Sequence, residues 1–481
     1  MSDAILDLDA TGQLAELAAG RISAVELLKL SMARRDETHA NLNAVIVTDP
    51  DGARKTAQAS DTARARGEPQ GPLAGLPMTA KDTLDVEGMP ASSGLPAYLN
   101  RTCQDATVIA RARAAGAIIW GKTNVPVMAG DWQSFNDLYG TSNNPWDVTR
   151  TTGGSSGGAA SALATGVTPL EIGSDIGGSL RVPASYCGVY SHKPSWGAVS
   201  PFGHVPPAPG TRSPRDLNVV GPMARSARDL NLLFQVIADR PEPPIAVTAK
   251  IRVGLWLDEP TFPLDPQVRA VIETYAKALA ARGAQVEEIA SPVDAQHLST
   301  VYRRLLSSVL FTDLPPDQQA QMLAARPSIL QAMAAGSNDP YLSNVLDYTV
   351  SHAEWLAADE ARAQMANQVA AAFTRYDVIL APVTATPAFP HDHAPFNTRE
   401  LALSTGEKIA YASNLNWIAL ATACRLPATC VPAGLTADGL PVGVQLIGPP
   451  GGDAMTLAVA QAFETVRGFV DPARRGIRPL P

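Results

Sequence analysis

The amino-acid sequence predicts an α/β fold in which helices cover both faces of a central sheet. Two patterns lead to this prediction. Apolar residues recur at helical spacing through residues 10–65, and after them short apolar runs bounded by glycine or proline alternate with further helical stretches. Strands that alternate with helices are typical of a sheet covered by helices. A length of 481 residues with 46% hydrophobic residues is sufficient for a large core.

The same patterns divide the chain into four regions. Residues 1–65 are expected to form an N-terminal helical region, and residues 66–240 the main part of the core. An alanine-rich section then favours helices, and we interpret residues 241–400 as a helix-rich insertion or lid. Residues 401–481 are expected to return to the core. Four apolar runs are typical of strands: residues 117–120, 252–256, 377–380 and 442–446.

Composition excludes several classes of protein. The formal net charge is −8, and no long run of lysine and arginine occurs, so nucleic acid is not an expected partner. No run of about 18 apolar residues predicts a membrane span. The first residues lack the pattern of a secretory signal, which favours a cytoplasmic location. The four cysteines lack metal-site spacing and are expected to be small buried residues.

The stretch from residue 151 to residue 195 is the most informative part of the chain. A block of glycine and serine at residues 153–158 precedes an alanine-rich helix former that ends at Gly166. A helix of about ten residues carries the chain roughly 15 Å away. A strand, expected at residues 167–172, then recovers roughly 20 Å as part of an extended return. These lengths bring Ser179 back to the same end of the layer as Ser155.

Ser179 follows a glycine pair that can serve acyl transfer. A loop such as residues 176–179 can turn N–H groups toward one point, because glycine accepts the backbone angles this requires. Such donors would form an oxyanion hole. None of the seven histidines lies in a recognisable catalytic motif, so the alternative base is Lys81, at the end of an apolar run, if burial keeps it neutral. From these residues alone, ordinary tight turns and a solvated lysine remain open.

The glycine block and the motifs around it resemble the amidase signature family. That family includes fatty acid amide hydrolase, peptide amidases, malonamidase and the A subunit of glutaminyl-tRNA amidotransferase. The resemblance extends over essentially the full chain and is weakest from about residue 240 to residue 400. It implies the amidase signature fold, with a mixed central sheet. Further motifs that resemble family sequence are residues 121–126, 144–147, 181–184, 187–189, 192–195, 221–225 and 440–445.

The resemblance implies a Ser–cisSer–Lys triad made of Ser179, Ser155 and Lys81. Ser179 would attack the carbonyl and form an acyl-enzyme. Ser155, on a cis peptide bond, would pass the proton to neutral Lys81, and Lys81 would return it to the departing amine. Burial can lower a lysine pKa by the roughly 3 units that neutrality near pH 7 requires.

The resemblance also assigns residues around the triad. Residues 128–139 should line the acyl pocket, and their mixture of aromatic and polar side chains fits an aromatic or mid-sized neutral acyl group. The N–H of Ser179 itself belongs to the oxyanion loop. The other residues of the oxyanion and substrate-binding set are Ile176, Gly177, Gly178, Ala129 and Met128, and those that support the loop and the serine network are Ser156, Asp175 and Arg181.

The expected activity is hydrolysis of a carbon–nitrogen amide bond in a small or mid-sized neutral amide, anilide or carbamate, with ester hydrolysis as an extension. No cofactor or metal is expected, because His391 and His393 lie in a proline-rich loop without a third ligand nearby. The expected partner is a small molecule, not a nucleic acid or a membrane, and a homodimer is left open.

Three other functions compete with this interpretation. Residues 153–157 fit the G-x-S-x-G pattern of an α/β-hydrolase, which would also need a histidine and an acidic residue. A glycine-rich loop at a helix N-terminus can bind phosphate, but the Gly-Lys-Ser/Thr ending of a P-loop is missing. The third alternative is the A subunit of a glutamine-dependent amidotransferase complex, which shares the triad.

Overall fold

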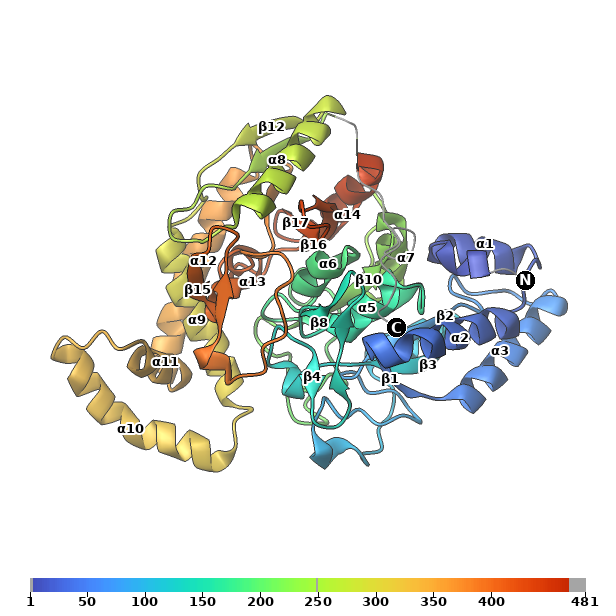
Figure 1. The fold of residues 1–481 in the computed structure, drawn as a ribbon, viewed down its shortest axis with the longest axis horizontal. Helices are drawn as coiled ribbons and strands as arrows, with labels where there is room; N and C mark the ends of the chain where they lie inside the picture. Colours follow the sequence, from blue (N-terminus) through green and yellow to red (C-terminus); the bar gives the residue numbers. More distant parts are fainter. Residues whose placement is uncertain (1–2, 248–249, 467–481) are drawn as a thin grey trace.

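An eleven-stranded sheet runs through the molecule, and Figure 1 shows how the helices are arranged around it. The structure, a computed structural model, describes residues 3–247 and 250–466. In spatial order the strands are β1 (Val45–Thr48), β3 (Ile118–Thr123), β2 (Pro77–Lys81), β8 (Leu170–Asp175), β10 (Val219–Ala224), β9 (Tyr190–Lys193), β16 (Ala428–Leu435), β17 (Pro441–Ile447), β13 (Val378–Pro382), β11 (Arg252–Leu255) and β12 (Gln285–Glu288).

The sheet is mixed, as predicted. Strand β2 runs parallel to β3 and β8, and β11 runs parallel to β12 and β13. The other neighbouring pairs are antiparallel. Shorter strands form three two-stranded sheets: β4 (Phe135–Asn136) with β5 (Gly140–Thr141), β6 (Asn143–Asn144) with β7 (Asp147–Thr151), and β14 (Glu400–Ala402) with β15 (Lys408–Ala410).

Both faces of the sheet are covered by a hydrophobic core. Successive residues of a strand point to opposite faces. In β13, Val378 and Leu380 belong to one buried cluster, whereas Ile379 and Ala381 belong to the other. Both clusters also contain residues from helices, so helices cover both faces of the sheet. This arrangement confirms the predicted α/β class.

The helices outside the region 241–400 surround the sheet. The first three lie within residues 1–65, and β1 lies between α2 and α3 and pairs with β3. Strand β1 has only four residues and is held in the sheet by its pairing with β3, so the helical pattern of this region does not reveal it. These helices are α1 (Ala10–Ala18), α2 (Ala24–Leu42), α3 (Pro50–Ala65), α4 (Thr107–Ala114), α5 (Gly157–Ala164), α6 (Arg181–Cys187), α7 (Ala227–Ile237), α13 (Ala419–Ala423) and α14 (Asp453–Ala462).

The region 241–400 differs from the expected helical insertion, because it contributes β11, β12 and β13 to the central sheet. Helix α8 (Pro266–Ala281) connects β11 to β12. The remaining helices run between β12 and β13, and α10 and α11 extend away from the body at the lower left of Figure 1. These four helices are α9 (Ala295–Phe311), α10 (Pro316–Ala334), α11 (Pro340–Tyr348) and α12 (His352–Ala372).

The four strands expected from apolar runs are confirmed as β3, β11, β13 and β17. The strand expected at residues 167–172 is instead β8, at Leu170–Asp175. The preceding residues form a turn in which the Val167 amide donates to the Ala162 carbonyl and Thr168 Oγ1 donates to the Leu170 carbonyl. Apolar character alone does not separate this buried turn from the strand. None of the helices within residues 3–247 and 250–466 is long and apolar enough to cross a membrane.

Candidate active site

Two parallel strands bring the candidate residues to one edge of the sheet. Lys81 is the last residue of β2, and Ser174 and Asp175 end β8. Because the two strands are parallel neighbours, with Ala80 opposite Ile172, their carboxyl ends lie at the same edge. The carboxyl edge of parallel strands is where ligands bind in open α/β sheets.

The Lys81 amine is buried between two hydroxyl groups. Its Nζ lies 2.7 Å from Ser155 Oγ and 2.9 Å from Ser174 Oγ, both within hydrogen-bond distance. The side chain is 0% exposed. Burial lowers the pKa of Lys81 to about 7, against the opposing effect of Asp175 and Glu171. Near neutral pH a substantial fraction of this amine therefore carries a lone pair.

Glu171 is a buried carboxyl group close to Lys81. It accepts hydrogen bonds from the Thr79 hydroxyl and, at 3.2 Å, from the Thr123 hydroxyl. Burial raises the pKa of Glu171 to about 8, because the two hydroxyl groups and the nearby lysines compensate only in part. Most of this group is protonated at neutral pH, so it supplies little counter-charge to Lys81.

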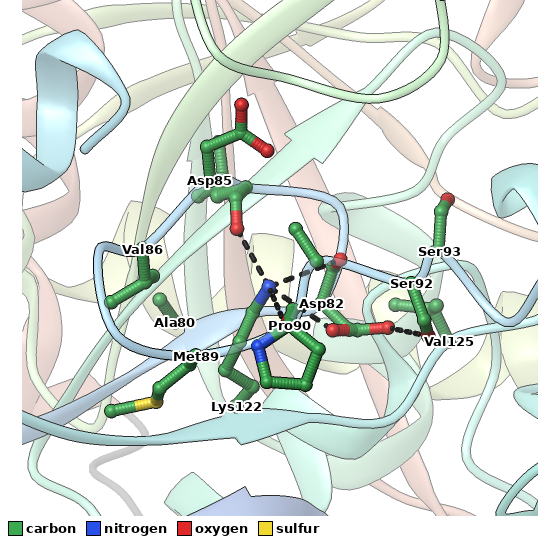
Figure 2. A network of polar contacts seen from close by, with 12 residues as sticks. Ala80, Asp82, Asp85, Val86, Met89, Pro90, Ser92, Ser93, Lys122 and Val125 are labelled. Atoms are coloured by element: carbon green, nitrogen blue, oxygen red, sulfur yellow. Dashed lines mark hydrogen bonds and ion pairs between the residues drawn. The ribbon is translucent and has the colours of Figure 1, made fainter. Parts of the chain in front are cut away.

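Lys122 is a second buried lysine and has a different environment (Figure 2). Its Nζ lies 3.1 Å from the Asp82 carboxylate and donates to the main-chain carbonyls of Asp82, Leu84 and Pro90 at 2.7–3.3 Å. The Ser92 hydroxyl donates to the other Asp82 oxygen at 2.6 Å. This network holds the loop that follows Lys81, and it places a carboxylate in direct contact with Lys122, whereas the hydrogen-bond partners of the Lys81 amine are hydroxyl groups.

The loops of the two serines are in contact. The Ser156 amide donates to the Ser179 carbonyl at 3.2 Å, and the peptide bond between Gly154 and Ser155 is cis. Ser155 is 1% exposed and Ser179 is 6% exposed. A Cβ on Gly154 would overlap the Asp131 carbonyl. That glycine therefore permits a close approach of two backbones, a use that the sequence does not reveal.

The loop after β8 is supported by a buried ion pair. Arg181 donates to both carboxylate oxygens of Asp175 at 3.1 Å, and both side chains are 0% exposed. Arg181 also donates to Thr422 Oγ1 at 2.7 Å and to Gln445 Oε1 at 2.9 Å, both from the C-terminal part of the chain. Burial alone would raise the pKa of Asp175, but Arg181 holds it below its usual range. These contacts fix the base of the loop that carries Ser179.

Gly178 has an acceptor within the protein. Its N–H donates to Asp175 Oδ1 at 2.9 Å. Its φ of +88° favours glycine. Within the described chain, the amides of Ile176, Gly177 and Ser179 have no hydrogen-bond acceptor. Gly178 therefore supports the loop, and these three amides remain as candidate oxyanion donors.

We expect Arg181→Met to lower the free energy of unfolding by about 3–5 kcal/mol, because it leaves the Asp175 carboxylate buried without its partner. Chemical denaturation measures this change. Lys408→Met is the matched control, since the exposed pair with Glu400 should contribute little. Equal, small changes in the two variants would contradict the role assigned to Arg181.

The segment expected to line an acyl pocket starts with two unusual backbone conformations. Met128 and Ala129 have φ of +52° and +56° without being glycine, and such strain is concentrated at functional sites. Trp132 Nε1 donates to the Gly177 carbonyl at 2.7 Å, which joins this segment to the loop of Ser179. The Trp132 ring packs against Phe396 and Tyr411 at centroid distances of 5.5 and 5.2 Å.

The polar residues of this segment are engaged within the protein. Asp131 accepts from Arg399 at 2.6 Å and from the Tyr411 hydroxyl at 2.7 Å. Gln133 exchanges two hydrogen bonds with the main chain of Asp392, and Asn136 Nδ2 donates to Asn124 Oδ1 and the Val125 carbonyl. The polar character that the sequence suggested for the pocket therefore belongs largely to its supporting structure.

Two histidine sites bear on the sequence interpretation. His393 stacks on Phe135 at 4.0 Å between ring centroids, and the described residues contain no group of three or more metal-ligating side chains. His204, which sequence reasoning missed, lies 2.7 Å from Ser174 Oγ through Nε2. It comes from the loop at residues 203–206, and neither periodicity nor a motif indicates that this loop reaches the end of β8.

The α/β-hydrolase alternative would require a histidine beside a serine of the glycine block. His192 does form a pair with Asp453 at 3.0 Å, but its other ring nitrogen lies 2.9 Å from Thr429 Oγ1. Both ring nitrogens are thus occupied away from Ser155 and Ser179. A lysine, not this histidine, contacts the glycine block.

Comparisons with known proteins agree with this geometry. The family model described as Amidase matches residues 26–457. The chain belongs to the amidase signature family. The A subunit of glutamyl-tRNA(Gln) amidotransferase from Chloroflexus aurantiacus is 32% identical over 95% of this chain and 96% of its own length.

Solved amidase structures share the fold. A crystal structure described as an amidase has a TM-score of 0.80 and 29% identity, and covers 96% of this chain and 100% of its own. A bacterial aryl acylamidase of the amidase signature family has a TM-score of 0.81 and 26% identity, and covers 98% of this chain and 99% of its own. Amide-bond chemistry is therefore the activity of the family to which this chain belongs.

Proposed function

We propose that this amidase hydrolyses the amide bond of a small or mid-sized neutral substrate through an acyl-enzyme on Ser179, with Ser155 and Lys81 as proton relay. One observation carries the proposal. The fully buried Lys81 amine, whose pKa is about 7, lies 2.7 Å from Ser155 Oγ, at the strand edge beside the loop of Ser179.

The chemistry follows from these contacts in two halves. Ser179 Oγ attacks the carbonyl carbon while its proton passes through Ser155 to the lone pair of Lys81. The protonated lysine then returns a proton through Ser155 to the amine as the C–N bond breaks. A water molecule repeats the same steps on the acyl-enzyme and releases the acid.

Charge develops on the carbonyl oxygen during attack, and the loop after β8 can stabilise it. The amides of Ile176, Gly177 and Ser179 have no acceptor within the described chain. Preorganised donors of this kind are usually the largest catalytic contribution in acyl transfer. Asp175 and Arg181 hold the loop in place, so the donors need not reorganise as the charge appears.

A neutral substrate is the best match to the aromatic wall beside this loop. Trp132 and Tyr411 are buried and pack with Phe396, and the carboxylate beside them, Asp131, is paired with Arg399. A paired, largely buried carboxylate offers no free charge to a substrate. Anilides and carbamates also contain a carbonyl carbon bonded to nitrogen and carry no net charge, so they belong to the same substrate class.

The second candidate function is that of an amidotransferase A subunit. The 32% identity to the A subunit of glutamyl-tRNA(Gln) amidotransferase over nearly the whole of both chains supports it. The discriminating experiment assays the purified chain alone against glutamine and a panel of anilides, primary amides, carbamates and esters. Turnover of neutral amides without partner subunits supports the hydrolase. Glutamine hydrolysis that appears only with partner subunits would support the alternative.

We expect kcat/KM for a neutral anilide to rise with pH and to reach a plateau, with a midpoint near pH 7. The amine must be neutral to accept the Ser179 proton, so activity is lost as pH falls through the Lys81 pKa of about 7. The titratable groups around this amine are Asp175, Glu171 and His204, and burial and Lys81 keep the pKa of His204 well below this pH range. Rates for 4-nitrobutyranilide between about pH 5 and pH 9 test the expectation. A flat profile would show that Lys81 does not act as base.

A further inference from the structure

Ser174 links the candidate base to a buried histidine. Lys81 Nζ lies 2.9 Å from Ser174 Oγ, and the same oxygen lies 2.7 Å from His204 Nε2. The other ring nitrogen of His204, Nδ1, lies 2.7 Å from the carbonyl oxygen of Pro206. The four groups form one unbranched chain of hydrogen bonds that ends on a main-chain carbonyl.

The loop that carries His204 is tied to the loop that follows Lys81. The Val205 amide donates to the Thr83 carbonyl at 2.7 Å, and the Asp85 amide donates to the Gly203 carbonyl at 2.8 Å. His204 is 6% exposed. The residues before and after His204 are therefore both hydrogen-bonded to the loop that follows Lys81. These bonds fix the distance between the imidazole and Ser174.

The chemistry of the groups gives every hydrogen bond in this chain a direction. A carbonyl oxygen only accepts, so His204 Nδ1 carries the proton. Burial and the neighbouring Lys81 lower the pKa of His204 to about 3, so the ring is neutral and Nε2 is an acceptor. Ser174 has a single hydroxyl proton, which must point to Nε2. Toward Lys81, Ser174 Oγ can then act only as an acceptor.

We propose that His204 is a positioning residue which, through Ser174, orients the neutral amine of Lys81 so that its lone pair faces Ser155. The inference rests on the proposed function, in which Lys81 takes the proton of Ser179 through Ser155. Because Ser174 donates its proton to His204, its Oγ accepts one N–H of Lys81. Ser174 then has no proton left to donate to the Lys81 lone pair. Without His204, the Ser174 hydroxyl can turn and donate into that lone pair.

The rate of Ser179 labelling by a fluorophosphonate tests this inference without knowledge of the substrate. We expect His204→Phe to lower the second-order labelling rate at the pH plateau by about 10- to 100-fold, the range that one or two hydrogen bonds correspond to. We also expect the acidic limb of the profile of labelling rate against pH to move to lower pH, because a hydrogen bond from the Ser174 hydroxyl to the lone pair of Lys81 stabilises the neutral amine. A residue that only stabilises the fold would not move this limb.

Three further variants make the result specific. His204→Gln can accept the Ser174 proton with its amide oxygen and should recover part of the rate. Ser174→Ala should lower the rate as His204→Phe does, and Ser174→Thr, which keeps the hydroxyl group, should not. In the Ser174→Ala background, His204→Phe should add no further loss, since His204 acts only through Ser174. If His204→Phe does not fold, the comparison of Ser174→Ala with Ser174→Thr still tests the inference.

Controls separate this inference from the proposed function. His192→Gln changes another buried imidazole that has no contact with Lys81, and it should leave the acidic limb in place. If Lys81→Met and Ser179→Ala abolish labelling while His204→Phe and Ser174→Ala stay within twofold of wild type, His204 has no positioning role. Additive losses from His204→Phe and Ser174→Ala would also overturn it. If Ser179→Ala is still labelled at the wild-type rate, the proposed function itself is wrong.

Discussion

Ser179→Ala should lower kcat for amide hydrolysis by about 10⁴-fold or more, because it removes the atom that forms the acyl-enzyme while it leaves the oxyanion donors in place. The loop should survive the change, since its supports are the main chain and the Asp175–Arg181 pair, not the Ser179 hydroxyl. The measurement is kcat and KM for 4-nitrobutyranilide, with the unfolding free energy of both proteins.

Ser156→Ala is the matched control for this substitution. Ser156 is the next residue after Ser155 and is equally buried, but its hydroxyl donates to the Ser174 carbonyl, at 3.4 Å. Its loss should reduce turnover far less than the loss of the Ser179 hydroxyl. A Ser179→Ala variant that keeps more than about a hundredth of the wild-type kcat would contradict the assignment of the nucleophile.

Lys81→Met should reduce anilide hydrolysis more than hydrolysis of the matched ester. An amine is a poor leaving group and must be protonated as the C–N bond breaks, whereas a nitrophenolate leaves largely unaided. General acid–base catalysis typically contributes roughly 10²–10⁴-fold, and the ester should lose only the share that activates Ser179. Methionine keeps a long unbranched side chain in the buried site, so the cavity is small. The measurement is kcat/KM for 4-nitrobutyranilide and 4-nitrophenyl butyrate.

Lys193→Met provides the control for removal of a buried amine. Lys193 is as buried as Lys81, and burial likewise lowers its pKa to about 7, but its Nζ donates to the Pro194 carbonyl. Any loss in this variant should be the same for the two substrates. Equal losses on anilide and ester in Lys81→Met would mean that Lys81 serves only as base or as support, and the leaving-group step would have to be revised.

Much of the fold could be predicted from the sequence, because it follows from local patterns. The apolar runs that became β3, β11, β13 and β17 are buried strands bounded by glycine or charged residues. Strand β12 (Gln285–Glu288) has no such signal, since its side chains are mostly exposed and it is placed by pairing with β11. This is why residues 241–400 resemble a helical insertion although part of them completes the sheet.

The candidate site, like the fold, could be predicted from the sequence only in part. Lys81 and Ser155 are in direct contact, as the family resemblance implied. Ser179 lies on a loop hydrogen-bonded to Ser156, and motif spacing had placed it at the same end of the layer as Ser155. The use of the Gly178 amide by Asp175 depends on three-dimensional geometry that no spacing rule contains. The approach of His204 to Ser174 joins residues 30 positions apart through a loop without periodicity. Such long-range contacts are what the structure adds to the motif.

The most direct test of the account is the position of the covalent adduct after reaction with a fluorophosphonate. Intact-protein mass spectrometry followed by peptide mapping should find one adduct per chain, on Ser179, formed fastest above about pH 7 where Lys81 is neutral. An adduct on Ser155 or Ser156, or full amide turnover by protein that carries the adduct on Ser179, would contradict the proposal that Ser179 is the nucleophile of this amidase.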